Sequence, residues 1–227
     1  MITSGVLATR HDRMLSWEWV EGHSEEIWER TLEHLQLTAW SVGIGFVIAM
    51  AMALVSLRWR RAYGPLAAAS GALYSIPSLA LFAILVPFTG LGFRPVLIAL
   101  VTYTLLILLR NIVAGVDGVP REVVEAAEGM GYEPWRRFLA VDLRLATPAI
   151  IGGLRVATVT VIGLVTVGAL VGSGGYGAFI NDGLSRNFST PIIVGGGLSI
   201  AMAVVFDLAF VLLQRVATPW ARAGAHR

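Results

Sequence analysis

The sequence contains no cysteine and no lysine, and only 14% of its 227 residues are charged. Without cysteine the chain forms no disulfide and no zinc–thiolate or iron–sulfur site. Without lysine it has no nucleotide-binding P-loop, because that loop needs its lysine to contact the phosphates. All 17 basic residues are arginines, and the net charge of +2 is small.

Apolar residues make up 56% of the chain, whereas soluble domains average about 45–50% apolar and roughly 25% charged residues. Too few polar side chains are present to cover a water-soluble domain, so the composition indicates an integral membrane protein. The N-terminal stretch has no apolar h-region, and we therefore expect no cleaved signal peptide.

Five apolar runs are long enough to cross a hydrocarbon core of about 30 Å as helices. In lipid every backbone polar group needs a partner within its own segment, so such runs are predicted to be helical. We therefore predict an all-α integral membrane protein with five transmembrane helices. The predicted spans are about residues 35–57, 65–88, 95–116, 146–171 and 191–213.

The arginines gather in alternate loops, and arginine-rich loops of membrane proteins lie on the cytoplasmic side. One set of loops carries most of them: Arg58, Arg60, Arg61, Arg121, Arg136, Arg137, Arg144, Arg215, Arg222 and Arg227. The N-terminal tail and the opposite loops carry five more: Arg10, Arg13, Arg30, Arg94 and Arg186. The N-terminus is therefore predicted outside and the C-terminus inside.

Three parts are predicted along the chain. Residues 1–33 form an acidic external tail, for which we predict a short amphipathic helix on the outer membrane surface. Residues 34–217 form the transmembrane domain, and residues 218–227 form a cytoplasmic tail. The tail contains tryptophans that are typical of interfacial anchors: Trp17, Trp19 and Trp28.

A polar stretch at residues 117–145 separates the third span from the fourth. Pro120 favours the start of a short amphipathic helix, two glycines end that helix, and Pro134 begins a second one. The pattern predicts two short helices at an angle, with a flat patch around Ala126 and Ala127 that suits the groove of another protein.

This stretch resembles the EAA loop in the membrane-spanning subunits of bacterial ATP-binding-cassette importers, because Glu125-Ala126-Ala127 is followed after three residues by Gly131. In that family the loop forms a coupling helix that docks on a separate ATPase subunit, so the resemblance implies a fold like that of type I importers. The residues implied in coupling are Glu125, Ala126, Ala127, Gly131, Pro134 and Trp135. The alternative is a polar loop that only lies on lipid headgroups.

Longer stretches resemble the permeases for glycine betaine, carnitine, choline and other quaternary-amine osmoprotectants. These stretches are residues 32–38, 74–120, 152–163 and 172–184. The resemblance implies a multi-pass subunit of the bacterial inner membrane that is not an enzyme and has no cofactor, because a separate ATPase uses ATP and Mg. The expected partners are the lipid bilayer, a second permease (a copy or a paralogue), two ATPase subunits and an external substrate-binding protein, but no nucleic acid.

One residue departs from the family pattern, which usually has proline where this chain has Arg144. Without that proline, the second helix of the loop is predicted to run more continuously toward the fourth span. Two other functions stay open. One is a permease for methionine or another amino acid, and the other is a self-contained secondary transporter, although such carriers usually show internal repeats and intramembrane acidic relays.

Arg155 and Asp207 are ionisable residues within predicted spans, where charges usually pair or line a cavity. Arg155 follows Pro148 by seven residues, and Asp207 precedes Arg215 by eight. At 1.5 Å per residue the two side chains start about 10 and 12 Å deep from the same side. We predict an ion pair between them, with snorkelling of Arg155 to the surface as the alternative.

The second span is interrupted near its middle by Pro77, which frees a backbone carbonyl that Ser75 or Ser78 can satisfy. The break is interpreted either as a kink that bends or lines the substrate path, or as a static kink. Tyr74 and Tyr103 either offer aromatic faces to a quaternary ammonium or serve packing.

A glycine-rich segment at residues 172–177 lacks lysine, so nucleotide binding is not expected there. We interpret it as the flexible external end of the fourth span, which by resemblance lies near the gate that the binding protein contacts. The four histidines have no metal-ligand spacing, and no nucleophile–base set is present.

Overall fold

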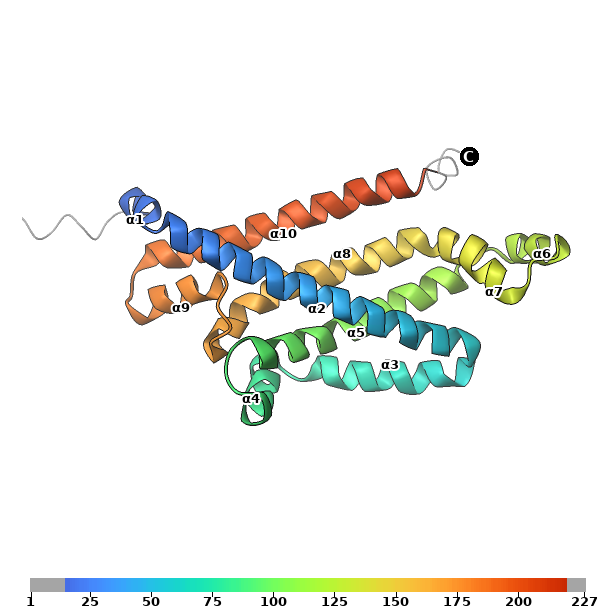
Figure 1. Ribbon diagram of the computed structural model, residues 1–227, viewed down its shortest axis with the longest axis horizontal. Helices are drawn as coiled ribbons and strands as arrows, with labels where there is room; N and C mark the ends of the chain where they lie inside the picture. The colour runs from blue at the N-terminus through green and yellow to red at the C-terminus, as the bar shows by residue number, and fades with distance from the viewer. Residues whose placement is uncertain (1–14, 220–227) are drawn as a thin grey trace, which may run out of the picture.

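The computed structural model describes residues 15–219, and every regular element within them is a helix (Figure 1). In chain order these are α1 (Trp17–Gly22), α2 (Ser24–Arg58), α3 (Arg60–Ser75), α4 (Ser78–Thr89), α5 (Phe93–Asp117), α6 (Arg121–Gly129), α7 (Pro134–Arg137), the π-helical turn η1 (Phe138–Asp142), α8 (Leu143–Gly168), the 3-10 turn η2 (Ala169–Val171), α9 (Gly177–Ser185) and α10 (Ser189–Ala217). The predictions for Arg10, Arg13, Arg222 and Arg227 lie outside the described residues.

Four helical runs among the described residues are long and apolar enough to cross a membrane. They are α2, α5, the run from α7 to η2 that contains α8, and α10. The pair α3–α4 passes the same test together, but it bends by 95° at its break. Within residues 15–219 the protein is therefore all-helical, with four candidate membrane spans, or five when the bent pair counts as one. The start of α2 and the end of α10 lie at opposite ends of the bundle (Figure 1).

The first span is longer than predicted, because α2 begins at Ser24 and runs to Arg58. The boundary predicted between residues 33 and 34 therefore falls inside one helix. No glycine or proline occurs between Ser24 and Thr38, so nothing breaks the backbone hydrogen bonds where the tail meets the apolar run. Within the described part of the tail, which starts at residue 15, α1 is the helix that is separate from the span, and its length is six residues.

The short helix α1 packs on the corner between α9 and α10. The Ser16 N–H donates to Thr190 Oγ1 over 3.0 Å. The Trp19 ring meets Phe179 edge to face, with ring centroids 5.7 Å apart. Trp19 is therefore half-buried against the bundle, while Trp17 and Trp28 remain exposed.

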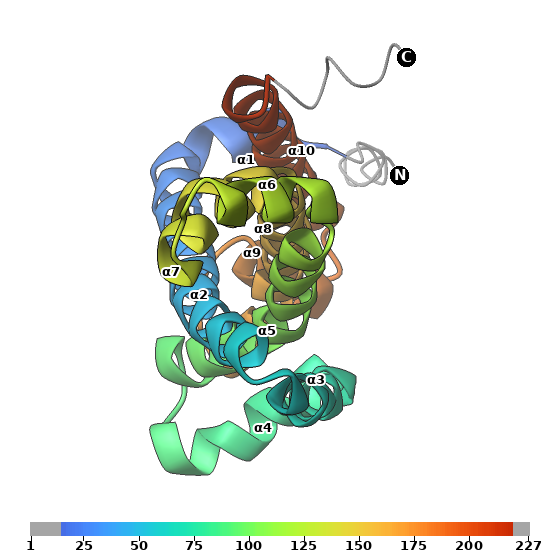
Figure 2. The ribbon, with the colours of Figure 1, turned by 90° about the vertical axis from the view of Figure 1, so that its right-hand side faces the viewer.

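The core is built around α5, which packs against α2, α3, α4 and α8. In the most apolar part of α5, 56% of the residues are buried, compared with 11% in α10. Figure 2 looks along the bundle and shows α3 and α4 set to one side of it. Most of the surface of α10 therefore faces away from the rest of the chain.

Small side chains allow α2 and α5 to approach closely. Ser41, Gly45, Ala49 and Ala53 follow each other at intervals of four residues on α2, and all are buried. A Cβ atom added at Gly45 would lie only 1.8 Å from Thr104 Oγ1. Glycine is required at this contact because no larger residue leaves room for the α5 side chain.

Candidate functional site

The polar stretch between α5 and α8 folds into a hairpin of two short helices at one end of the bundle (Figure 1). Pro120 precedes α6, and Pro134 is the first residue of α7. Between the helices, Gly131 has a φ of +80°, in the left-handed region that glycine adopts without steric cost. The Tyr132 N–H closes the turn by donating to the Ala127 carbonyl over 3.1 Å.

The outer face of the hairpin carries Glu125 and Ala126, which are both exposed. Ala127 is only 1% exposed, because α6 packs against α7 and η1. This burial corrects the prediction that Ala127 joins Ala126 in an outward-facing patch, since Ala127 instead fills the interior of the hairpin. Trp135 on α7 is 61% exposed, so a large aromatic ring remains available on the same hairpin.

Arg137 ties the hairpin to the start of α8. Its guanidinium donates to the carboxylate of Glu128 on α6, and its Nε donates to Asp142 Oδ2 over 3.3 Å. Asp142 is buried. The Trp135 ring stacks on Phe138, with ring centroids 5.7 Å apart. These contacts hold both helices of the hairpin in a defined orientation on the bundle, although the sequence pattern did not single out Arg137, Glu128 or Asp142.

The helix after the turn continues directly into the fourth span. α7, η1 and α8 follow one another without a break from Pro134 to Gly168. This continuity matches the expectation from Arg144, because a proline there would remove a backbone donor. The run still has two irregular features. Five residues form a wider π-helical turn in η1, and Pro148 lies inside α8 without ending it.

The break between α3 and α4 is held by three hydrogen bonds. Pro77 has no N–H to donate, and the Leu73 carbonyl accepts from Ile76 N–H instead, over 3.3 Å. The Ser75 hydroxyl donates to the Ala72 carbonyl over 2.7 Å. The Tyr103 hydroxyl on α5 donates to the Ile76 carbonyl. The freed carbonyls therefore have hydrogen-bond partners. One of these partners is the Tyr103 hydroxyl, which belongs to a helix that is distant from the break in sequence.

The two tyrosines beside the break pack against each other. Their rings are nearly perpendicular, with centroids 5.7 Å apart. Tyr103 is 4% exposed, and its hydroxyl is engaged at the break, so its ring belongs to the interior. Tyr74 is 39% exposed and is the member of the pair that a ligand can reach.

Arg155 on α8 and Asp207 on α10 form a two-pronged ion pair. The Arg155 Nε donates to Asp207 Oδ1, and its Nη2 donates to Asp207 Oδ2 over 2.8 Å. A planar guanidinium fits a carboxylate in this fork geometry. The structure therefore has the pairing arrangement rather than the snorkelling one, and the pair links α8 to the sparsely packed helix α10.

We expect Arg155→Ala and Asp207→Ala each to lower uptake severalfold, because either change leaves one charge without its partner among apolar helices. The double variant Arg155→Ala/Asp207→Ala is expected to be no worse than the poorer single variant. Transport by the three variants in proteoliposomes gives the double-mutant cycle. A double variant whose loss equals the product of the two single losses argues against a functional pair.

At the opposite end of the bundle, the glycine-rich loop between η2 and α9 is held against α2. The Gly175 N–H donates to the Glu33 carboxylate over 2.8 Å, and the Tyr176 N–H donates to His34 Nδ1 over 3.3 Å. The Tyr176 hydroxyl donates to Thr31 Oγ1 over 3.0 Å. The prediction of a flexible end is therefore corrected. The sequence hints at these contacts only in that two polar residues, Glu33 and His34, stand where the apolar run begins.

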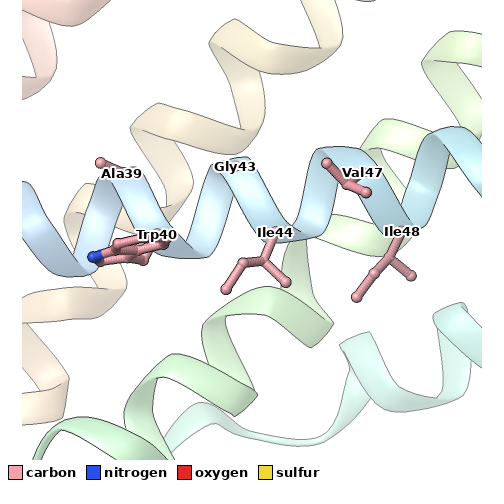
Figure 3. A pocket seen from close by; sticks show the side chains of 6 residues that line it. All are labelled: Ala39, Trp40, Gly43, Ile44, Val47 and Ile48. Carbon is pink, nitrogen blue, oxygen red and sulfur yellow. The ribbon is translucent and has the colours of Figure 1, made fainter.

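An apolar hollow follows one side of α2. Its lining residues all come from that helix, and Figure 3 shows Trp40, Ile44 and Ile48 pointing to the same side of it. Trp40 is 59% exposed and Val47 is 68% exposed. These side chains offer no charge to a polar substrate, so the hollow is typical of a helix face in an apolar environment.

No group of three or more His, Asp or Glu side chains in residues 15–219 is placed to hold a metal ion. His34 is buried between α2 and α8, where its Nε2 lies 3.1 Å from the Ile162 carbonyl. With Nδ1 accepting from Tyr176, Nε2 carries the proton and donates to that carbonyl. This histidine therefore has a structural role in the contact between the helices.

The sequence matches a known protein family over most of its length. The family model described as the binding-protein-dependent transport system inner membrane component matches residues 41–218. The match covers the candidate spans from within α2 to the end of α10, and it includes the hairpin.

Curated relatives match most of the chain. It is 30% identical over 203 residues to the choline transport system permease protein OpuBB of Bacillus subtilis (strain 168), which covers 89% of this chain and 93% of that protein. It is 33% identical over 194 residues to the osmoprotectant import permease protein OsmW of Salmonella typhimurium, covering 83% of this chain and 90% of that one.

A solved structure has a similar fold. A chain in the inward-facing MetNI methionine ABC transporter superposes with a TM-score of 0.75 at 20% identity, covering 90% of this chain and 100% of that chain. At this identity the likeness concerns the fold alone. The helical arrangement is therefore that of a type I importer permease.

Proposed function

The chain belongs to the family of binding-protein-dependent transport system inner membrane components, and on this premise we propose that it forms the membrane path of an importer for osmoprotectants such as glycine betaine, choline or carnitine. As a member of that family it is a multi-pass permease that has no catalytic centre or cofactor of its own. ATP is hydrolysed by a separate ATPase subunit, and a binding protein supplies the substrate.

The proposed orientation places the hairpin end of the bundle in the cytoplasm. Most loop arginines lie at that end, which includes the α2–α3 turn, the hairpin and the end of α10. Arginine-rich loops remain on the cytoplasmic side. The opposite end, with α1, α9 and the glycine-rich loop, then faces the binding protein.

The proposed coupling surface is the outer face of the hairpin. Glu125 and Ala126 are exposed on α6, and Trp135 is exposed on α7. Gly131 and Pro134 set the turn between the two helices, while Ala127 supports it from inside. Docking of an ATPase subunit on this face transmits the closure of that subunit, because the hairpin continues directly into α8. Two permease subunits, identical or paralogous, are proposed to enclose the path between them.

The observation that carries the substrate proposal is the similarity to permeases named for choline and osmoprotectants, each matched over more than 80% of this chain. The break at Ser75, Pro77 and Ser78, with Tyr74 and Tyr103 beside it, is our candidate for a gate or for part of the pathway. A methionine or amino-acid importer is the second candidate, supported only by the fold likeness. Family membership favours either candidate over a self-contained secondary transporter.

The test measures ATP hydrolysis by the complete transporter in proteoliposomes with its binding protein. Glycine betaine, choline or carnitine is expected to raise the hydrolysis rate above the substrate-free rate and to accumulate inside when ATP is supplied to the ATPase side. Stimulation by methionine and not by any of the three quaternary amines replaces the proposed substrate class with the second candidate. Accumulation that continues without ATP contradicts the importer mechanism itself.

A further inference from the structure

A cavity of about 550 Å³ lies beside the hairpin, and it shares Trp135 with the face proposed to dock the ATPase but not Glu125 or Ala126. It is formed by the last turns of α2, the α2–α3 turn, the end of α5 and the residues of α7 and η1. The side chains that matter for its chemistry are Val55, Leu57, Arg58, Trp59, Trp135 and Phe138.

The walls of the cavity change from apolar to cationic along α2. Leu54, Val55 and Leu57 line it first, and Arg58 follows at the end of the helix. Because α2 is a candidate span, this direction runs from the hydrocarbon core toward the membrane surface. An acyl chain against the aliphatic residues therefore places a lipid headgroup next to the guanidinium.

The charges around the cavity leave one arginine available. Arg60 is already paired with Asp117, with donor–acceptor distances of 2.7 and 2.6 Å. Arg137 is paired with Glu128 and Asp142. Arg58 is exposed and forms no ion pair within residues 15–219. A phosphate group supplies the negative charge that this guanidinium lacks.

Two tryptophans flank the same opening. Trp59 and Trp135 are each 61% exposed, and neither indole N–H donates a hydrogen bond within the part of the chain that the structure describes. Tryptophans are enriched at the level of lipid headgroups, because the ring is apolar and its N–H is a donor. A phosphodiester at this depth can accept from both the guanidinium and an indole.

We propose that this cavity binds an anionic phospholipid, with its phosphate at Arg58 and its acyl chains along the end of α2. Basic pockets between helices at a membrane surface are suited to such headgroups. The proposal rests on the proposed orientation only in assigning the lipid to the cytoplasmic leaflet. The lipid then contacts both the end of α2 and the α7–η1 side of the hairpin, and it leaves Glu125 and Ala126 uncovered.

The test is native mass spectrometry of the assembled transporter, purified in detergent with equal amounts of phosphatidylglycerol and phosphatidylcholine. The unaltered protein is expected to retain phosphatidylglycerol in excess. Arg58→Gln is expected to reduce that excess about fivefold, which is the contribution of one arginine near an anionic lipid surface. Arg61→Gln is the matched control, because Arg61 is exposed three residues further on and does not line the cavity.

Four results overturn the proposal. The first is equal retention of the two lipids, and the second is an equal effect of Arg58→Gln and Arg61→Gln. The third is displacement of the lipid by excess inorganic phosphate, which identifies a free-phosphate site. The fourth is lipid that binds to the isolated chain but not to the assembled transporter, which would mean that the ATPase covers the cavity. Binding in detergent depends on neither orientation nor transport, so its failure leaves the proposed function untouched.

Discussion

A transporter that carries Glu125→Arg is expected to lose substrate-stimulated ATP hydrolysis and uptake by about tenfold or more. Glu125 is exposed on the outer face of α6 and has no ion pair in residues 15–219, so the change costs little in the folded chain. Reversing a charge at a docking surface places like charges together or removes a favourable pair, and every 1.4 kcal/mol lost from an interaction is a factor of ten. Hydrolysis and uptake in proteoliposomes measure the effect.

The matched control is Glu29→Arg, which makes the same charge change at an exposed position near the start of α2, far from the hairpin. ATP hydrolysis without binding protein is compared in both variants, and Glu29→Arg is expected to leave this rate unaltered while Glu125→Arg lowers it. Circular dichroism and the yield of extracted protein check that both variants fold. A folded Glu125→Arg transporter with full stimulated hydrolysis and uptake removes the hairpin face from the coupling model.

Gly177→Ala is expected to have the largest effect on stability. A Cβ atom at this position lies 2.0 Å from the Thr166 carbonyl oxygen and 2.8 Å from Ala169 Cβ. The nearest atom belongs to the backbone, so no side-chain rotation relieves the clash. Overpacking typically costs about 1–3 kcal/mol, and displacement of α9 also strains the contacts of Tyr176 with α2. Thermal unfolding of the protein in detergent measures the loss.

Gly163→Ala provides the control for that experiment. Gly163 lies in α8, and a Cβ atom there meets nothing within 4 Å. Replacing a helical glycine by alanine in open space stabilises a helix by up to about 1 kcal/mol. The two alanine variants are therefore expected to shift the unfolding temperature in opposite directions. Equal shifts contradict the close packing described at the α8–α9 corner.

The long spans were predictable because their apolar runs match the membrane thickness. The ion pair between Arg155 and Asp207 was also predicted, with snorkelling of Arg155 as the alternative, because both depths were counted from the same membrane surface. Both predictions need only the pattern of apolar residues and the rise per residue of a helix, and the sequence is sufficient for both. The early start of α2 could have been predicted in the same way, because no glycine or proline between Ser24 and the apolar run breaks a helix.

Contacts between distant segments were not predictable in this way. The 95° bend depends on Tyr103 as well as on Pro77, and Tyr103 lies on another helix. The glycine-rich loop was interpreted as the flexible external end of the fourth span, yet Glu33 and His34 hold it across 142 residues of sequence. Burial of Ala127 likewise follows from how α6 meets α7, which helical periodicity does not specify.

The unbroken run from Pro134 to Gly168 also has a mechanical consequence. At 1.5 Å per residue it contains about 50 Å of helix, with the proposed docking end outside the bundle and most of its length inside (Figure 1). Because no loop separates the proposed docking end from the span, a displacement imposed near Trp135 is expected to reach α8 instead of being absorbed by a linker. Arg155 lies on the same run and is paired with Asp207, so α10 is expected to follow the movement of α8.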